Sequence, residues 1–295
     1  MGLMFDSFWR AVAYCMHPRV IALSFLPLVL MVAASLGLGY FFWDAALDGV
    51  RAQLESSVLV SSVSGWLESL GVGRLNTVVA PLIVIFSVTP LIVMVSMLLV
   101  ALFMTPSLVS LVAEKRFPKL ERKQGATFLL SLAWSLGSLL MALFALLVSL
   151  PLWLVPPLIL VLPPLIWGWL TYRVMAFDAL ADHASRQERQ ILFARHRLWL
   201  LGMGVFTGYL GSAPSLIWAS GAVMAAAFVI LVPLAIWIYT LVFAFSSLWF
   251  AHFNLAALQA LRKEQSQHAE SAALTPDALA LSNADKLIPL DSIPR

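Results

Sequence analysis

The sequence has few charged residues and a single cysteine, and these two shortages exclude several classes of protein. Only 11% of its 295 residues are Asp, Glu, Lys or Arg, whereas 61% are hydrophobic. A soluble domain has about 25% charged and about 45–50% apolar residues. The lone thiol, Cys15, excludes an internal disulfide and a cysteine-based metal site. The composition therefore predicts an integral membrane protein whose surplus apolar surface faces lipid.

Four stretches contain no Asp, Glu, Lys or Arg, and they predict the elements that enter the membrane. They are residues 20–43, 75–113, 124–172 and 198–261. The first would form a helix of about 36 Å, enough for a bilayer core of about 30 Å. The second is expected to be one long helix interrupted by Pro81, Pro90 and Pro106.

The third stretch carries five prolines near its middle, which predict a turn and therefore a helical hairpin. They are Pro151, Pro156, Pro157, Pro163 and Pro164. Proline removes a backbone donor and disfavours helix in the residue before it. The tip of this hairpin lies either outside the membrane or at membrane depth, where it needs burial in protein or contact with water. The fourth stretch predicts a second hairpin, with Gly204 and Gly208 as a small-residue face for close helix packing.

The expected fold is thus an all-α integral membrane protein with two long transmembrane helices and two helical hairpins that either cross or re-enter the bilayer. Residues 3–16 have the spacing of an amphipathic anchor helix. Sixteen of the 18 Lys and Arg residues lie outside the 44–74 loop, so the positive-inside rule places the N-terminus in the cytoplasm. We expect one polytopic membrane domain over residues 1–261 and a disordered cytoplasmic tail over residues 262–295.

Arg19 and Val20, at the start of the first membrane helix, form the predicted binding site. Pro18 suits the first turn of a helix, and the amides of Arg19 and Val20 would then be free. Free amides, the positive end of the helix dipole and one arginine are suited to binding an anion. The alternative is that Arg19 only flanks the membrane helix as a positive-inside residue.

Other combinations of residues give no sign of catalysis. Asp178, Asp182 and His183 are close in sequence, but neighbouring arginines favour a solvated, salt-bridged helix face over a metal site. No nucleophile motif, zinc pattern or pair of intramembrane carboxylates occurs, and no Asp or Glu falls inside an apolar stretch, which weighs against proton- or cation-coupled pumping. We expect no enzyme, cofactor, metal or nucleic-acid partner.

Three segments resemble the CysZ sulfate-permease family, which belongs with the eukaryotic etoposide-induced membrane proteins. They are FWRAVAYCMHPR at 8–19, ALFMTPSLVSLVAE at 101–114, and 172–183 followed by RHRLWLLGMG at 195–204. The resemblance implies oligomers, a plasma (inner) membrane location and sulfate uptake. It also implies an anion site at a Gly-x-Arg-Arg motif, whose matching positions here are His17, Pro18, Arg19 and Val20, with Arg19 the one arginine.

Two functions remain open at this point. The first is a permease or channel for a small inorganic anion, with sulfate as the leading candidate. The second is a membrane scaffold or envelope-organisation protein that transports nothing. In both, the partners expected are the lipid bilayer and further copies of the chain.

Overall fold

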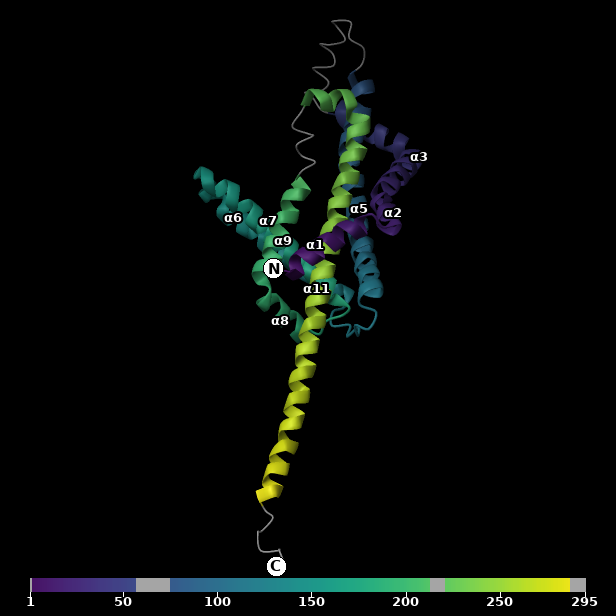
Figure 1. Cartoon of the computed structure of the whole chain (residues 1–295). Coiled ribbons are helices and arrows are strands. Elements are labelled where there is room, and N and C mark those ends of the chain that lie inside the picture. Colours follow the sequence, from purple (N-terminus) through teal and green to yellow (C-terminus); the bar gives the residue numbers. More distant parts are fainter. Residues whose placement is uncertain (1, 57–74, 213–220, 287–295) are drawn as a thin grey trace, which may run out of the picture. The chain divides into compact units, whose positions relative to one another are not determined.

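The computed structural model of the chain describes residues 2–56, 75–212 and 221–286, and every ordered element among them is a helix (Figure 1). The predicted all-α class is confirmed. The helices in chain order are α1 (Gly2–Cys15), α2 (Pro18–Ser24), α3 (Leu26–Glu55), α5 (Leu75–Arg116), α6 (Phe128–Ser149), the 3-10 helix η1 (Leu150–Leu154), α7 (Pro156–Ala181), α8 (Arg186–Arg195), α9 (Arg197–Ser212) and α11 (Gly221–Lys286).

Four helical stretches of the described residues are long and apolar enough to cross a membrane. They are Pro18–Leu54, Val79–Arg116, Leu129–Leu154 and Ile230–Ser271, with mean hydropathies between 2.0 and 2.7. Large apolar side chains on them are exposed, among them Leu36 at 69% and Phe86 at 73%. These exposed side chains fit contact with acyl chains, so the chain is an integral membrane protein.

The chain divides into two compact units. The first comprises Met1–Ala11, Val109–Gly208 and Leu248–Arg295, and the second Val12–Leu108 and Tyr209–Ser247. The expected single domain over residues 1–261 stays a prediction.

In the second unit, α2 and α3 are separated at Phe25, whose backbone N–H is bonded to carbonyls of the preceding turn. Pro27 is the second residue of α3, in its first turn, where the missing N–H has no intrahelical partner to lose. Leu47 of α3 packs in a buried cluster with Ala80 and Val84 of α5. Of the loop expected at 44–74, residues 44–55 belong to α3, and residues 57–74 lie outside the described part.

The predicted long second helix is α5, which runs for 42 residues with Pro81, Pro90 and Pro106 inside it. At 1.5 Å per residue it is about 63 Å long, roughly twice the bilayer core.

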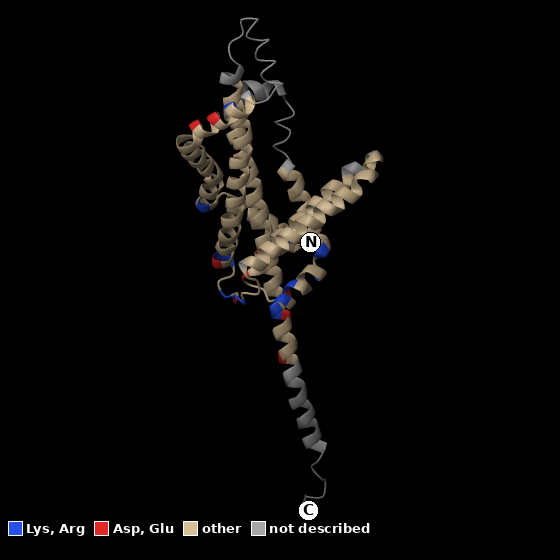
Figure 2. Ribbon diagram, turned by 180° about the vertical axis from the view of Figure 1, so that it is seen from behind, with Lys and Arg blue, Asp and Glu red and all other residues tan. Residues whose placement is uncertain are grey.

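In the first unit, α6, η1 and α7 form a helical hairpin, and Figure 2 shows no charged residue along it until its base. Thr127 caps α6 by accepting a hydrogen bond from the Leu130 amide. The α-helical conformation ends at the 3-10 helix η1, which contains Pro151, and begins again at Pro156, the first residue of α7. The expected turn is therefore shorter than the five prolines suggested, because Pro163 and Pro164 lie inside α7.

Two glycines let α7 and α9 approach closely in this unit. A Cβ added to Gly204 would fall on the carbonyl oxygen of Gly168, and a Cβ on Gly168 would lie 2.7 Å from the backbone N of Val205. A Cβ on Gly208 would meet nothing within 4 Å, so the close approach uses Gly204 and not Gly208.

Helix α11 continues through Lys286, beyond the position where the sequence led us to expect a disordered tail. Its residues just after Leu261 include Lys263, Glu264 and Gln265, which are strong helix formers. Arg262 is also fixed by an ion pair to Glu188. Helix propensity and this tertiary contact together outweigh the polar composition on which the expectation was based.

Candidate functional site

Arg19 and Val20 lie in the first turn of α2, as expected, but their amides are not free. His17 caps the helix: its Nδ1 accepts a hydrogen bond from the Arg19 N–H at 3.2 Å, and its carbonyl oxygen accepts one from the Val20 N–H at 2.9 Å. The prediction of two free amides is therefore wrong, because His17 itself supplies both acceptors. The Arg19 residue is exposed, and Val20 is fully buried at 0%.

The end of α2 is held by a contact with α11 within the second unit. The indole N–H of Trp237 donates to the Ser24 hydroxyl at 2.9 Å, and the Trp237 ring stacks on Phe25 with centroids 5.2 Å apart. These contacts fix the α2–α3 break and with it the position from which the Arg19 side chain projects.

A first charged cluster, in the other unit, joins α1, α5 and α11 around Asp6. Asp6 accepts from Arg10 Nε at 2.9 Å and from Arg116 Nη2 at 2.7 Å. The hydrogen bond from Arg10, followed by that from Arg116, lowers the pKa of Asp6 in spite of its partial desolvation. Arg116 Nη1 also lies 3.2 Å from Nδ1 of the buried His252. One carboxylate therefore serves two arginines, and the trio has a net positive charge.

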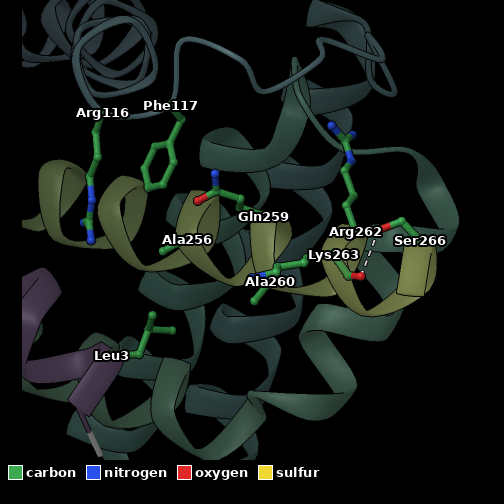
Figure 3. A pocket seen from close by; sticks show the side chains of 9 residues that line it. All are labelled: Leu3, Arg116, Phe117, Ala256, Gln259, Ala260, Arg262, Lys263 and Ser266. Carbon is green, nitrogen blue, oxygen red and sulfur yellow. Dashed lines mark hydrogen bonds between the residues drawn. The ribbon is translucent and has the colours of Figure 1, made fainter. Parts of the chain in front are cut away.

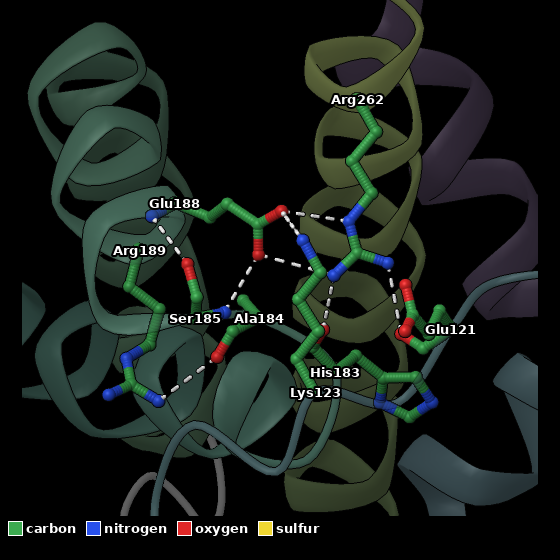
Figure 4. A network of polar contacts seen from close by, with 8 residues as sticks. All are labelled: Glu121, Lys123, His183, Ala184, Ser185, Glu188, Arg189 and Arg262. Carbon is green, nitrogen blue, oxygen red and sulfur yellow. Dashed lines mark hydrogen bonds and ion pairs between the residues drawn. The ribbon is translucent and has the colours of Figure 1, made fainter. Parts of the chain in front are cut away.

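A second charged cluster surrounds Glu188 of α8 (Figure 4). Its carboxylate accepts from Arg262 Nε at 2.9 Å, from Lys123 Nζ at 3.0 Å and from the Ser185 N–H at 2.7 Å. Burial alone would raise the pKa of Glu188, but the hydrogen bonds from Arg262, Ser185 and Lys123 outweigh it and lower this pKa to about 2. Arg262 also donates to the carbonyl oxygens of Glu121 and His183. The cluster ties the loop before α6 to α8 and α11.

An open pocket of about 880 Å³ lies beside these clusters (Figure 3). Its lining includes Arg116, Arg262 and Lys263, together with Gln259 and Ser266, and contains no acidic residue. Both arginines already donate to the carboxylates described above, whereas Lys263 is exposed and forms no ion pair within the described residues. The pocket is a positively charged recess, and among the described residues that line it Lys263 is a cation outside the ion pairs.

The hairpin holds one further arginine between two tryptophans. The guanidinium carbon of Arg173 lies 4.1 Å from the Trp134 ring centroid and 5.1 Å from that of Trp169. The Trp134 indole N–H donates to the Arg173 carbonyl oxygen at 3.1 Å. Arg173 Nε is buried and has no hydrogen-bond partner among the described residues. The two ring contacts therefore hold this charge at the base of the hairpin.

Asp178, Asp182 and His183 do not converge. Asp182 is exposed, whereas His183 is 2% exposed and its carbonyl oxygen accepts a hydrogen bond from Arg262. Burial raises the pKa of Asp178 to about 7. Burial, followed by the nearby Arg122, lowers the pKa of His183.

Sequence reasoning did not single out the residues of the two clusters. The ion pairs that join different elements in these clusters link residues 65 to 110 positions apart in the chain, and a single sequence gives no signal for such pairs. One signal was readable: Ser185 followed by Glu188 has the spacing of a capping box, which the structure forms.

Apolar spans, a proline-broken hairpin and charges gathered at the helix ends define a polytopic α-helical membrane protein. Residues 7–221 match the model of the family described as sulfate transporter CysZ/etoposide-induced protein 2.4, and the chain belongs to this family. No curated protein and no solved structure matches the chain.

Proposed function

We propose that the protein is a permease or channel for a small inorganic anion, with sulfate as the first candidate, in the plasma (inner) membrane. The observation that carries the proposal is the family match, which covers about three quarters of the chain and names a sulfate transporter. The charge pattern supports it, because each charged cluster holds more cations than carboxylates. A surplus of positive charge attracts anions.

The proposed anion contact is the Arg19 side chain, at the start of the first membrane helix. Because the Arg19 and Val20 amides donate to His17, binding there rests on the guanidinium and not on the backbone. A charged hydrogen bond contributes about 1.5–3 kcal/mol, so Arg19→Ala should weaken anion binding by roughly ten- to a hundredfold. Arg19→Lys should restore part of it, since lysine keeps the charge and loses the planar fork.

The test is uptake of labelled sulfate into proteoliposomes, together with sulfate binding to the purified protein. Arg51→Ala is the matched control, because it removes the same charge from an arginine of the same unit, whose ion pair among the described residues is with the neighbouring Asp48 at 3.5 Å. We expect uptake by the wild type and the control, and reduced uptake by Arg19→Ala. Unchanged binding in Arg19→Ala would reject the site, and no uptake above protein-free liposomes would reject transport of sulfate and favour a scaffold.

The proposed orientation places the N-terminus, the loop before α6, α8 and the C-terminal end of α11 in the cytoplasm. It rests on the Lys and Arg distribution. Single cysteines at Lys119 or Arg186, in a Cys15→Ser background, should react with a membrane-impermeant thiol reagent only after the membrane is opened. Labelling of either position from outside intact cells would invert the map.

A further inference from the structure

An aromatic pocket lies between α1, α9 and α11 in the first unit, apart from the charged clusters. Its volume is about 780 Å³, within the range of pockets that hold small ligands. Aromatic side chains dominate its walls: Phe5, Phe8, Trp9, Trp199, Phe206 and Trp249. No charged side chain lines it, so the pocket is suited to an apolar ligand.

The inner wall is built from three rings that contact one another edge to face. Phe8 lies 5.2 Å from Trp249 and 6.2 Å from Phe206, and the latter two centroids are 5.6 Å apart. The indole N–H of Trp249 donates to the Met4 carbonyl oxygen at 3.2 Å. Because this N–H already has a partner in the wall, the surface of the pocket that faces a ligand is apolar.

The mouth of the pocket is also apolar, and the described residues do not cover it. Trp9 is 67% exposed and Leu198 is 81% exposed. In a membrane protein the apolar phase that reaches such a mouth is the bilayer, and tryptophans are typical of its interface with water. Helix α1, which supplies Trp9, places its ion-paired Asp6 and Arg10 outside the lining.

We propose that this pocket binds one acyl chain of an anionic phospholipid. The charge next to the mouth favours an anionic headgroup: Arg197 is exposed, is the first residue of α9 and directly precedes Leu198. Asp6, the one carboxylate of α1, accepts hydrogen bonds from Arg10 and Arg116, so its negative charge is offset and does not repel an anionic headgroup. A basic side chain near a membrane surface strengthens the binding of anionic lipid by about fivefold.

Gly202 provides a direct way to fill the pocket. It lines the pocket, and a Cβ added to it would meet nothing within 4 Å. Gly202→Leu therefore places a side chain into the space proposed for the acyl chain. Gly208 on the same helix is equally open and does not line the pocket, which makes Gly208→Leu the matched control.

The experiment uses the purified full-length protein in detergent, titrated with phosphatidylglycerol or phosphatidylcholine that carries brominated acyl chains. Bromine quenches nearby tryptophans, of which three line the pocket. We expect saturable quenching in the wild type and in Gly208→Leu, and binding at least about tenfold weaker in Gly202→Leu, a change of about 1.4 kcal/mol. Arg197→Gln should weaken phosphatidylglycerol binding about fivefold and leave phosphatidylcholine binding unchanged.

Equal quenching in the wild type, Gly202→Leu and Gly208→Leu would overturn the proposal. If Gly202→Leu does not elute as a folded species, Trp9→Ser tests the same pocket from its exposed rim and should also weaken saturable quenching. A second copy of the chain is the competing occupant. Disulfide-linked dimers of Trp9→Cys, in a Cys15→Ser background and without saturable lipid quenching, would assign the pocket to a protein contact and reject the lipid.

Discussion

Replacing Glu188 by glutamine tests whether the second charged cluster holds the first unit together. The Glu188 side chain is 5% exposed and accepts hydrogen bonds from Arg262, Lys123 and the Ser185 amide. Glutamine has nearly the same shape and can keep the capping contact to Ser185. It loses the negative charge, however. When its oxygen accepts from the Ser185 N–H, its NH2 group faces Arg262 and Lys123 and cannot accept a hydrogen bond from either.

The size of the effect follows from the pKa of the carboxyl group. The contacts lower the pKa of Glu188 from 4.5 to about 2, which corresponds to roughly 3 kcal/mol of folding free energy at neutral pH. Because the pKa is lower in the folded protein than in the unfolded chain, this contribution is complete above pH 4.5. It is lost as the pH falls towards about 2. The difference in stability between wild type and Glu188→Gln should therefore shrink in acid.

Denaturant or thermal unfolding of the detergent-purified protein measures this difference across pH. Glu264→Gln is the control, because Glu264 pairs with Arg195 at 2.6 Å while both side chains are about half exposed. An exposed pair of this kind contributes little, so the control should unfold like the wild type. The reasoning fails if Glu188→Gln is no less stable than Glu264→Gln at neutral pH, or if its deficit does not diminish in acid.

Three further changes follow from the geometry of the first unit. Gly204→Leu should destabilise the protein by at least about 1–3 kcal/mol in thermal unfolding, because its Cβ falls on the Gly168 carbonyl oxygen, whereas Gly208→Leu should be tolerated. Burial raises the pKa of Asp178 to about 7, so the melting temperature of the wild type should fall as pH rises from about 4 to 7. Asp178→Asn should abolish this fall, and equal pH dependence of the two melting temperatures from pH 4 to 8 would contradict the prediction. Arg173→Lys should cost about 1 kcal/mol and shift tryptophan emission, because lysine cannot stack between the two indoles.

The helical fold followed from the sequence because the lipid environment leaves few alternatives. A long uncharged stretch must satisfy its backbone internally, so its position indicates a helix without knowledge of any neighbour. This reasoning located α5 and the α6–α7 hairpin. It failed where proline lies within a helix: Pro163 and Pro164 were assigned to the turn, yet they lie inside α7. Neighbouring helices and local adjustments can satisfy the backbone groups that proline frees in such helices.

The charged clusters could not be foreseen, for a different reason. Each joins residues from at least three segments, such as Asp6 to Arg116 and Glu188 to Arg262. Their pairing depends on how the helices pack, and a single sequence carries no pattern for it. The prediction of free amides at Arg19 failed for a local reason, because it treated the helix start as unsatisfied. It did not consider that the side chain of His17 could act as the cap.

The distribution of cations links the two clusters to the proposed transport of anions. Asp6 neutralises one of the two arginines around it, and Glu188 neutralises either Arg262 or Lys123. Among the described residues, each cluster therefore holds one more cation than carboxylates, and every cation in it has a protein partner. The pocket lined by Arg116, Arg262 and Lys263 thus has a positive potential without a buried, unpaired arginine. Such a potential concentrates anions at the protein surface and weakens as ionic strength rises.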